Sequence, residues 1–253
     1  MALFSQKITI LNFDECYQQQ KELLQTFPHR WLNLTTIKQT NLFCEHDSLM
    51  KIEQILKQND HRGITLIGSG NYHYVSLALM SDIKKPFTLI LMDHHTDIEP
   101  GSVPDLLSCG SWVYHALRLI PNLKQVIIVG SHTALPRYLS KTIKHKVKIF
   151  PNFTSNQLQT LEKSILTEHI YLSIDKDIFS PDIVQTNWDQ GTLQLEEAEK
   201  LITYLLHHKT CLGADICGEW KDPDGQSYRS TSRHAIRKNQ VANQELIHTL
   251  LSV

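Results

Sequence analysis

The chain has 253 residues, 41% of them hydrophobic, and its 25 basic and 26 acidic residues leave a formal net charge of −1. This balance excludes the basic footprint of a protein that binds nucleic acid or an acidic membrane surface. The five cysteines are odd in number and show no CxxC spacing, which excludes a disulfide framework and predicts reduced thiols in the cytoplasm.

The apolar runs are short: none approaches the length of a membrane span, and residues 1–14 lack the pattern of a signal peptide. Strands are predicted at Lys7–Phe13, Ile64–Gly68, Phe87–Met92, Gln125–Gly130, Lys146–Phe150, Ile170–Ile174 and Cys211–Ile216. Helices are predicted at Asp14–Thr26, Asp47–Lys57, Tyr74–Asp82, Pro104–Ile120, Ser155–Thr167, Glu196–His208 and Gln244–Ser252. This alternation predicts an α/β fold with a mostly parallel central sheet covered on both faces.

No linker rich in Gly, Pro or Ser divides the chain, so one domain over residues 1–253 is expected. The polar and basic stretch Lys221–Gln240 predicts a long loop after the last strand.

A strongly apolar strand ends in the segment Asp93-His94-His95-Thr96-Asp97. Ligand chemistry in an open α/β sheet gathers at the carboxyl ends of its strands. Residues i and i+2 of an extended segment point the same way, so Asp93, His95 and Asp97 are expected to face one point. The alternative is a solvated loop in which a carboxylate caps a helix.

Asp175 and Asp177 repeat this arrangement after the apolar run Ile170–Ile174. Alone, the pair is more typical of a turn with capping carboxylates. Four carboxylates and an imidazole that converge, however, would repel one another without cations. The two segments together therefore predict a site for one or two divalent metal ions.

Three other strand ends carry single candidate residues. His73 follows a turn with Gly68 and Gly70 at a predicted helix start, where the alternative is a capping or surface histidine. Glu219 ends the last apolar run and is a candidate partner for a cationic substrate group, or else a helix cap. His132 follows the run Gln125–Gly130 and is a candidate general acid or base, although an ordinary loop histidine is equally consistent.

These segments resemble the motifs of the arginase (ureohydrolase) family. Its D-x-H-x-D motif corresponds to Asp93–Asp97, its S-x-D-x-D motif to Ser173–Asp177, and its upstream G-G-D-H-S element loosely to Gly68–His73. The resemblance implies a three-layer α/β/α fold and two Mn²⁺ ions per chain. The implied ligands of the first ion are His73, Asp93, Asp97 and Asp175, and those of the second are His95, Asp93, Asp175 and Asp177.

By the same resemblance, Asp97 would orient a water molecule, Glu219 would bind the guanidinium group, and His132 would stand in for the proton-shuttling histidine. The guanidinium-binding glutamate of the family maps to Gly218 or Glu219, one residue out of register, and Glu219 is taken here.

Other family features are altered. The Asp-Pro after the third motif is replaced by Phe179-Ser180-Pro181, and Cys109-Gly110 replaces the expected His-Gly. The loop in which free-arginine enzymes carry an Asn near the α-carboxylate reads Ile98-Glu99-Pro100-Gly101-Ser102. This pattern resembles the peptide arginases, which convert arginine residues of ribosomally made peptides to ornithine. The implied partner is an arginine-containing precursor peptide; the oligomeric state stays open, although related enzymes often form homo-oligomers.

Four alternatives remain on the residues alone. Asp93-His94-His95 also resembles the DHH phosphoesterases, but those carry their other Asp motif upstream of it. Asp175-x-Asp177 comes too late in the chain for a phosphatase with an aspartyl nucleophile. A mononuclear zinc deacetylase would need only Asp93, His95 and one of the two later aspartates. A metal-binding scaffold without activity is the fourth.

Overall fold

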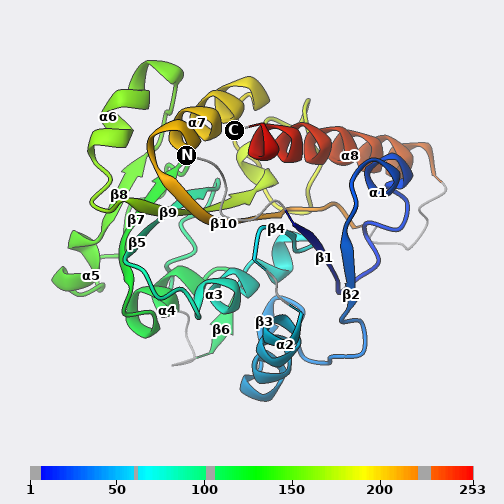
Figure 1. The fold of residues 1–253 in the computed structure, drawn as a ribbon, viewed down its shortest axis with the longest axis horizontal. Coiled ribbons are helices and arrows are strands. Elements are labelled where there is room, and N and C mark those ends of the chain that lie inside the picture. Colours follow the sequence, from blue (N-terminus) through cyan, green and yellow to red (C-terminus); the bar gives the residue numbers. More distant parts are fainter. Residues whose placement is uncertain (1–6, 60–61, 101–105, 222–228, 253) are drawn as a thin grey trace.

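The computed structural model describes residues 7–59, 62–100, 106–221 and 229–252. Its centre is a sheet of eight parallel strands (Figure 1) in the order β2-β1-β4-β10-β9-β5-β7-β8. In that order, the strands span Arg30–Asn33, Ile8–Asn12, Ile64–Leu66, Thr210–Cys217, His169–Asp175, Phe87–Met92, Leu123–Val129 and Val147–Phe150. A separate antiparallel pair joins β3 (Phe43–Cys44) to β6 (Leu107–Ser108).

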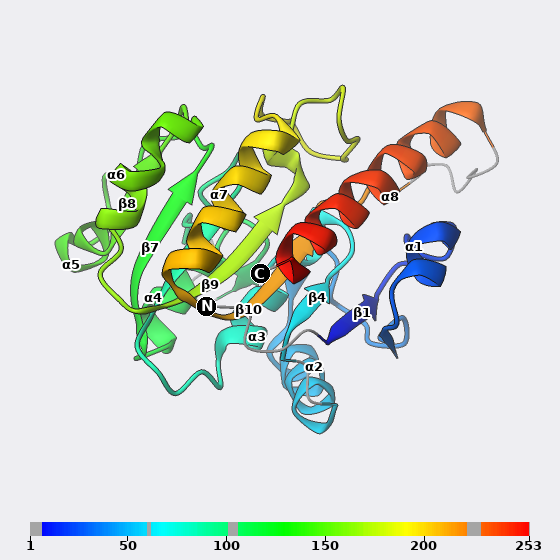
Figure 2. The same cartoon turned by 45° about the horizontal axis from the view of Figure 1, so that its top comes forward.

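Helices cover both faces of this sheet (Figures 1 and 2). One face packs against α1 (Lys21–Thr26), α6 (Leu158–Lys163), α7 (Leu195–His208) and α8 (Ser230–Leu251). The other packs against α2 (His46–Gln58), α3 (Val75–Met80) and α4 (Trp112–Leu119). The short helix α5 (Lys141–His145) precedes β8, and single turns lie at η1 (Gly70–Tyr72), η2 (Ser155–Gln157) and η3 (Lys176–Ile178).

The central strands are buried on both sides, which explains why their sequences are continuous apolar runs. In β5, Leu89 and Leu91 belong to one hydrophobic core, whereas Ile90 and Met92 belong to the other. The predicted three-layer α/β fold of the arginase type, with its mostly parallel central sheet, is therefore confirmed. No helix in the described ranges is both long and apolar enough to span a bilayer.

The predicted loop at Lys221–Gln240 is wrong from Ser230 onward, where α8 begins; residues 222–228 lie outside the described part. The buried face of this helix includes Ser232, Ala235 and Asn239. Small and polar residues on a buried face hide the apolar periodicity that identifies a helix.

Other differences from the prediction include the starts of two helices and one unpredicted edge strand. The helix expected at Asp14–Thr26 begins only at Lys21, because Glu15 has a left-handed backbone with φ of 66°. The helix expected at Pro104–Ile120 begins at Trp112. Strand β2 was not predicted, because as an edge strand it buries only one of its four residues.

Candidate metal centre

Four neighbouring segments meet at the carboxyl end of the sheet. Asp93 follows β5, Asp175 ends β9, and Cys217 ends β10, and these three strands are adjacent. His73 follows the η1 turn, after β4 on the other side of β10. All four side chains are buried, so the sheet itself delivers these polar groups to one enclosed point.

His73 lies at the centre of the first group of candidate ligands. Its Nδ1 is 3.0 Å from Asp97 Oδ2, 3.3 Å from Asp93 Oδ2 and 3.4 Å from Asp175 Oδ2. Donor atoms about 2.1 Å from a shared metal ion stand roughly 3.0–3.4 Å from one another, by the geometry of octahedral and tetrahedral sites. The separations around His73 therefore match donors that share one ion.

The tautomer of His73 follows from its hydrogen bond with Ser173, which in turn contacts Asp215. Ser173 Oγ donates to Asp215 Oδ1 at 2.7 Å, so it accepts from His73 Nε2, which is 2.9 Å away. Nε2 consequently carries a proton, and Nδ1, directed at the carboxylates, is the ring atom that can bind an ion. Neither His73 Nδ1 nor Asp93 Oδ2 has a hydrogen-bond partner among the described residues. Lone pairs that face one another in a buried site fit a bound cation, and a hydrogen bond to the far ring nitrogen is typical of a metal-ligating histidine.

His95 organises a second group beside the first. Its Nδ1 is 2.9 Å from Asp177 Oδ2 and 3.6 Å from Asp93 Oδ1. Asp93 thus presents one carboxylate oxygen to each group, as a bridging ligand would. On its far side, His95 Nε2 is 3.0 Å from Asp189 Oδ1, which fixes the orientation of the ring.

Asp97 is held in an unusual backbone conformation, with φ of 48°. Trp112 Nε1 donates to Asp97 Oδ2 at 2.6 Å, and Val113 N donates to the Asp97 carbonyl at 2.9 Å. A non-glycine residue in the left-handed region is uncommon, and such residues concentrate at functional sites. The start of α4 therefore fixes the direction of this carboxylate.

The electrostatics of the cluster show an excess of negative charge. Burial and the nearby Asp97 raise the pKa of Asp93, and burial and Asp177 raise that of Asp175. Burial and Asp93 raise the pKa of Asp177 to about 7. For His95, burial lowers the pKa, but contacts with Asp177 and Asp93 outweigh it and raise the value to about 12. In the absence of a cation the cluster thus retains protons that a divalent ion would replace.

A cavity of about 250 Å³ opens onto this cluster. Its described wall contains no Lys or Arg, and it includes the exposed carboxylate of Glu99 and the indole of Trp188. The Trp188 ring stands edge-on to His95, with centroids 5.8 Å apart. The described lining residues are Gly70, Asp93, His95, Thr96, Asp97, Glu99, Ser108, Cys109, Gly110, Thr133, Asp175, Asp177 and Trp188.

Glu219 is buried, but it does not line this cavity. Its Oε1 accepts from Lys176 Nζ and, at 2.6 Å, from Asn243 Nδ2. Its Oε2 accepts from Gln20 Nε2 at 2.7 Å and from Asn239 Nδ2 at 3.3 Å. The carboxylate is therefore already neutralised inside the protein.

Gly218, the other position to which the guanidinium-binding glutamate maps, has a φ of +84°. A Cβ atom there would overlap Asp175 Oδ1 and lie 2.7 Å from the backbone nitrogen of Lys176. Only glycine fits this close approach. The end of β10 therefore directs no glutamate into the cavity.

His132 is exposed and lines a neighbouring hollow with His94 and Gln190, outside the cavity at the candidate metal centre. Of the predicted metal ligands, the structure brings His73, Asp93, His95, Asp97, Asp175 and Asp177 together.

Sequence reasoning missed four residues that the structure places at or beside the site. Cys217 belongs to an apolar run and gives no separate signal of a ligand. Lys176 lies between two aspartates that were predicted as metal ligands, and no function was predicted for it. Trp188 and Asp189 come from a loop without periodicity, so no local signal could have identified them.

Comparisons with known proteins identify the family and the fold. Residues 9–237 match the sequence model of the Arginase family. A Thermotoga maritima protein, described only as uncharacterized, is 30% identical over 213 residues, which are 84% of this chain and 79% of that protein.

Among solved structures, proclavaminate amidino hydrolase from Streptomyces clavuligerus superposes with a TM-score of 0.69 at 12% identity, covering 98% of this chain and 92% of that one. A putative agmatinase from Clostridium difficile gives 0.68 at 14% identity and covers 98% of each chain. Arginase from Bacillus subtilis gives 0.62 at 16% identity, covering 98% and 99%. At these identities the structures show the shared fold.

Proposed function

The chain belongs to the arginase family, whose ureohydrolases cleave C–N bonds of linear amidines, and from this premise we propose that it converts arginine residues of a peptide to ornithine with release of urea. Two Mn²⁺ ions per chain, the family's metals, would be held by the groups around His73 and His95. The two orphaned buried atoms, on His73 and Asp93, support this assignment. Carboxylate with some imidazole is also a donor set that Mn²⁺ accepts.

Bound metal ions would supply an acidified water molecule and stabilise developing negative charge. The protein's own contribution is positioning. Asp97, fixed by Trp112 and by its backbone, would accept a hydrogen bond from a water molecule in the cavity and so orient it. Asp189 would keep the His95 ring in place.

The guanidinium group requires negative or aromatic partners in the cavity wall. Glu219 is paired with Lys176 and lies outside that wall, so we assign this function instead to Glu99 and Trp188. A carboxylate can bind a guanidinium through two parallel hydrogen bonds, and an indole face attracts a cation. Asp189 and His95 do not supply such a surface, because they face each other.

One observation favours a peptide over free arginine: the described cavity wall is rich in carboxylates and contains no Lys or Arg. Glu99 stands exposed at the wall, where it accepts a hydrogen bond from the Tyr138 hydroxyl. A free α-carboxylate beside Glu99 would meet like charge, with no Lys or Arg side chain in the described wall to pair with it. In a peptide the same carbonyl is a neutral amide, so only the cationic side chain has to be matched.

The test compares three substrates with the manganese-loaded protein: an arginine-containing peptide, free arginine, and agmatine, which is a guanidino compound without a carboxylate. Mass spectrometry and a urea assay are expected to show ornithine and equimolar urea from the peptide, with free arginine at least about tenfold slower. A preference for free arginine would refute the proposal. A preference for agmatine would replace it with a small guanidino amine as the substrate.

Glu99→Gln provides the matched variant, because it removes the charge and keeps the shape. Its turnover of free arginine relative to the peptide is expected to rise. An unchanged ratio would show that Glu99 does not select against the α-carboxylate.

A further inference from the structure

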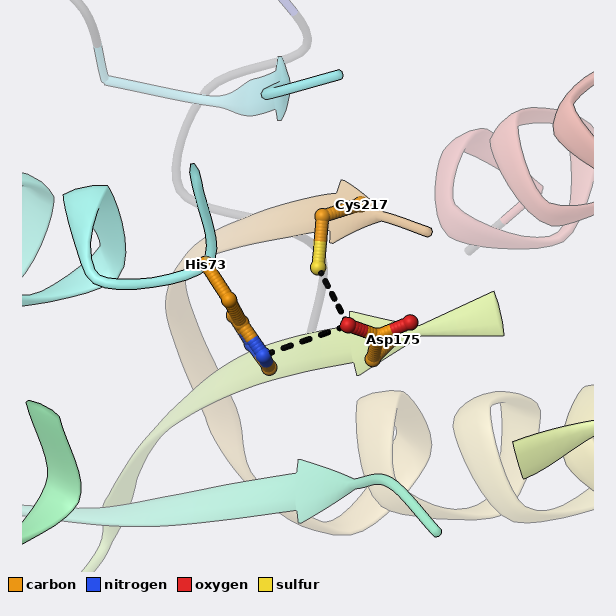
Figure 3. Close-up of side chains that lie close together, drawn as sticks. All are labelled: His73, Asp175 and Cys217. Carbon is orange, nitrogen blue, oxygen red and sulfur yellow. Dashed lines mark hydrogen bonds and ion pairs between the residues drawn. The ribbon is translucent and has the colours of Figure 1, made fainter. Parts of the chain in front are cut away.

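Cys217 lies beside the first group of candidate ligands, on the neighbouring strand. It pairs in register with Asp175, and parallel neighbours in register direct their side chains to the same face. Its Sγ is buried and donates to Asp175 Oδ2 at 3.1 Å. Figure 3 shows Cys217 and His73 both directed at the same carboxylate oxygen of Asp175, which lies 3.1 Å from Cys217 Sγ and 3.4 Å from His73 Nδ1.

The sulfur belongs to a compact set of donor atoms. Donor atoms of Cys217, His73 and Asp175 all lie within 4.8 Å of one another, and each residue is buried. One ion can reach all three, since metal–sulfur bonds are about 2.3 Å long and metal–nitrogen bonds about 2.0–2.1 Å. His73 is 1% exposed, and its Nδ1 has no hydrogen-bond partner in the described chain, so this set contains a buried donor atom that a bound ion would satisfy.

We propose that Cys217 is a sulfur ligand of the metal ion held by His73, so that this site combines nitrogen, oxygen and sulfur donors. Sulfur donors favour softer divalent ions, zinc and cobalt among them, over manganese. The group around His95 offers only nitrogen and oxygen and keeps the preference for manganese. Binding exchanges the S–H···O hydrogen bond for a sulfur–metal bond, and the thiol proton leaves to solvent.

This inference rests on the dinuclear site of the proposed function, but it does not depend on the substrate. A second cysteine near the site, Cys109, lacks the placement of Cys217 among donor atoms. Cys109 also lines the cavity, yet it belongs to none of the ligand groups found among the described residues. It is therefore the matched control for any effect of removing a thiol near the site.

The experiment titrates metal-free protein with Co²⁺ and records its absorption spectrum, while mass spectrometry counts the bound ions. We expect two ions per chain and a near-ultraviolet sulfur-to-cobalt charge-transfer band. Cys217→Ser should lose the band, and its preference for Zn²⁺ over Mn²⁺ in a competition assay should fall by about tenfold or more. Cys109→Ser should keep both.

Two bound cobalt ions without the band in the unsubstituted protein would overturn the sulfur ligand and leave the dinuclear site standing. A band that persists in folded Cys217→Ser would overturn it as well. Absence of bound cobalt would remove the site itself, and with it the proposed function. Because the band in the unsubstituted protein is decisive alone, a variant that failed to fold would not block the test.

Discussion

Two buried polar clusters share the segment Asp175-Lys176-Asp177, and they differ in how their charges are balanced. Asp175 and Asp177 contribute to the metal centre, where carboxylates outnumber cations and two polar atoms have no partner. Lys176 points the other way, into a network with Glu219 in which the positive and negative charges cancel. Asn243 completes that network by accepting from Lys176 at 3.0 Å and donating to Glu219 at 2.6 Å.

The difference separates two uses of buried charge. A paired and fully hydrogen-bonded cluster fixes structure, and here it joins α8 to the end of β10. A cluster with surplus lone pairs is complete only when a ligand is bound. Burial alone would not have distinguished them, because both Lys176 and Asp93 are almost fully enclosed.

The largest effect is expected from Asp93→Asn in the unsatisfied cluster. Asp93 presents an oxygen to each ligand group, so its loss should reduce the metal content from two ions to one or none. Urea release should fall below detection. Elemental mass spectrometry and the urea assay measure the two results.

Asp47→Asn serves as the control, because that exposed carboxylate lies in the first turn of α2, away from the site. Full metal content in Asp93→Asn would contradict the bridging assignment.

Changes in the balanced cluster of Lys176 and Glu219 should alter the free energy of unfolding. Lys176→Met leaves the Glu219 charge buried without its partner, which typically costs about 3–5 kcal/mol of unfolding free energy. Urea denaturation measures this loss. The double variant Lys176→Met/Glu219→Met should recover most of it, since both charges are then gone.

Lys200→Met tests the specificity of that effect, because Lys200 forms surface ion pairs with Glu196 at 2.8 Å and with Glu197 at 3.2 Å. Its unfolding midpoint should stay unchanged. Equal losses in Lys176→Met and Lys200→Met would refute the structural importance of the buried network.

A smaller effect is expected outside the ligand set. Asp189→Asn weakens the contact that orients His95 from its far ring nitrogen. Loss of such an outer partner lowers metal affinity by roughly 10–100-fold, and the exposure of Asp189 places the expected change near tenfold. Isothermal titration with Mn²⁺ would measure it, and an affinity equal to that of the unsubstituted protein would argue against this orienting contact.

The smallest effect is a pH dependence that only the metal-free protein should show. Asp177 has a folded-state pKa of about 7, raised from 3.8, so its stabilising contribution is complete below about pH 4 and is lost as the pH rises through 7. The raised pKa of His95 acts in the same direction. The melting temperature of chelator-treated protein should therefore fall by roughly a few degrees from about pH 5 to 8.

With Mn²⁺ present, the trend should reverse, because metal binding requires deprotonated ligands and strengthens as the pH rises. A melting temperature that rises with pH in the chelated protein would contradict the excess of buried carboxylates.

The core of the sheet was predictable because its strands carry their own signal. Continuous apolar runs identified β5 and β9, whose side chains are buried on both faces. The part of α8 before Gln244 was not predictable, since Asn239 and Asn243 occupy its buried face. These residues are buried because they form hydrogen bonds with Lys176 and Glu219, which lie far away in the sequence.

The site divides in the same way. Asp93, His95 and Asp97 follow one strand, so their closeness is local in the sequence, but Asp97 reaches the site through a left-handed backbone that alternation does not predict. The pairing of Glu219 with Lys176 depends on the ends of β9 and β10 and on α8. No residue spacing within the sequence predicts it. From the sequence, Cys217 is indistinguishable from the other apolar residues of its strand. Only its register with Asp175 places it beside the candidate ligands.

Gly218 restricts how this protein can change over generations. A glutamate at this position, facing the cavity, would need the space that Asp175 Oδ1 and the Lys176 backbone occupy. On this backbone, a glutamate substituted at position 218 would therefore displace a carboxylate of the metal centre. Substitutions that change the substrate would therefore act through the cavity wall around Glu99 and Trp188, because the end of β10 has no room for a longer side chain.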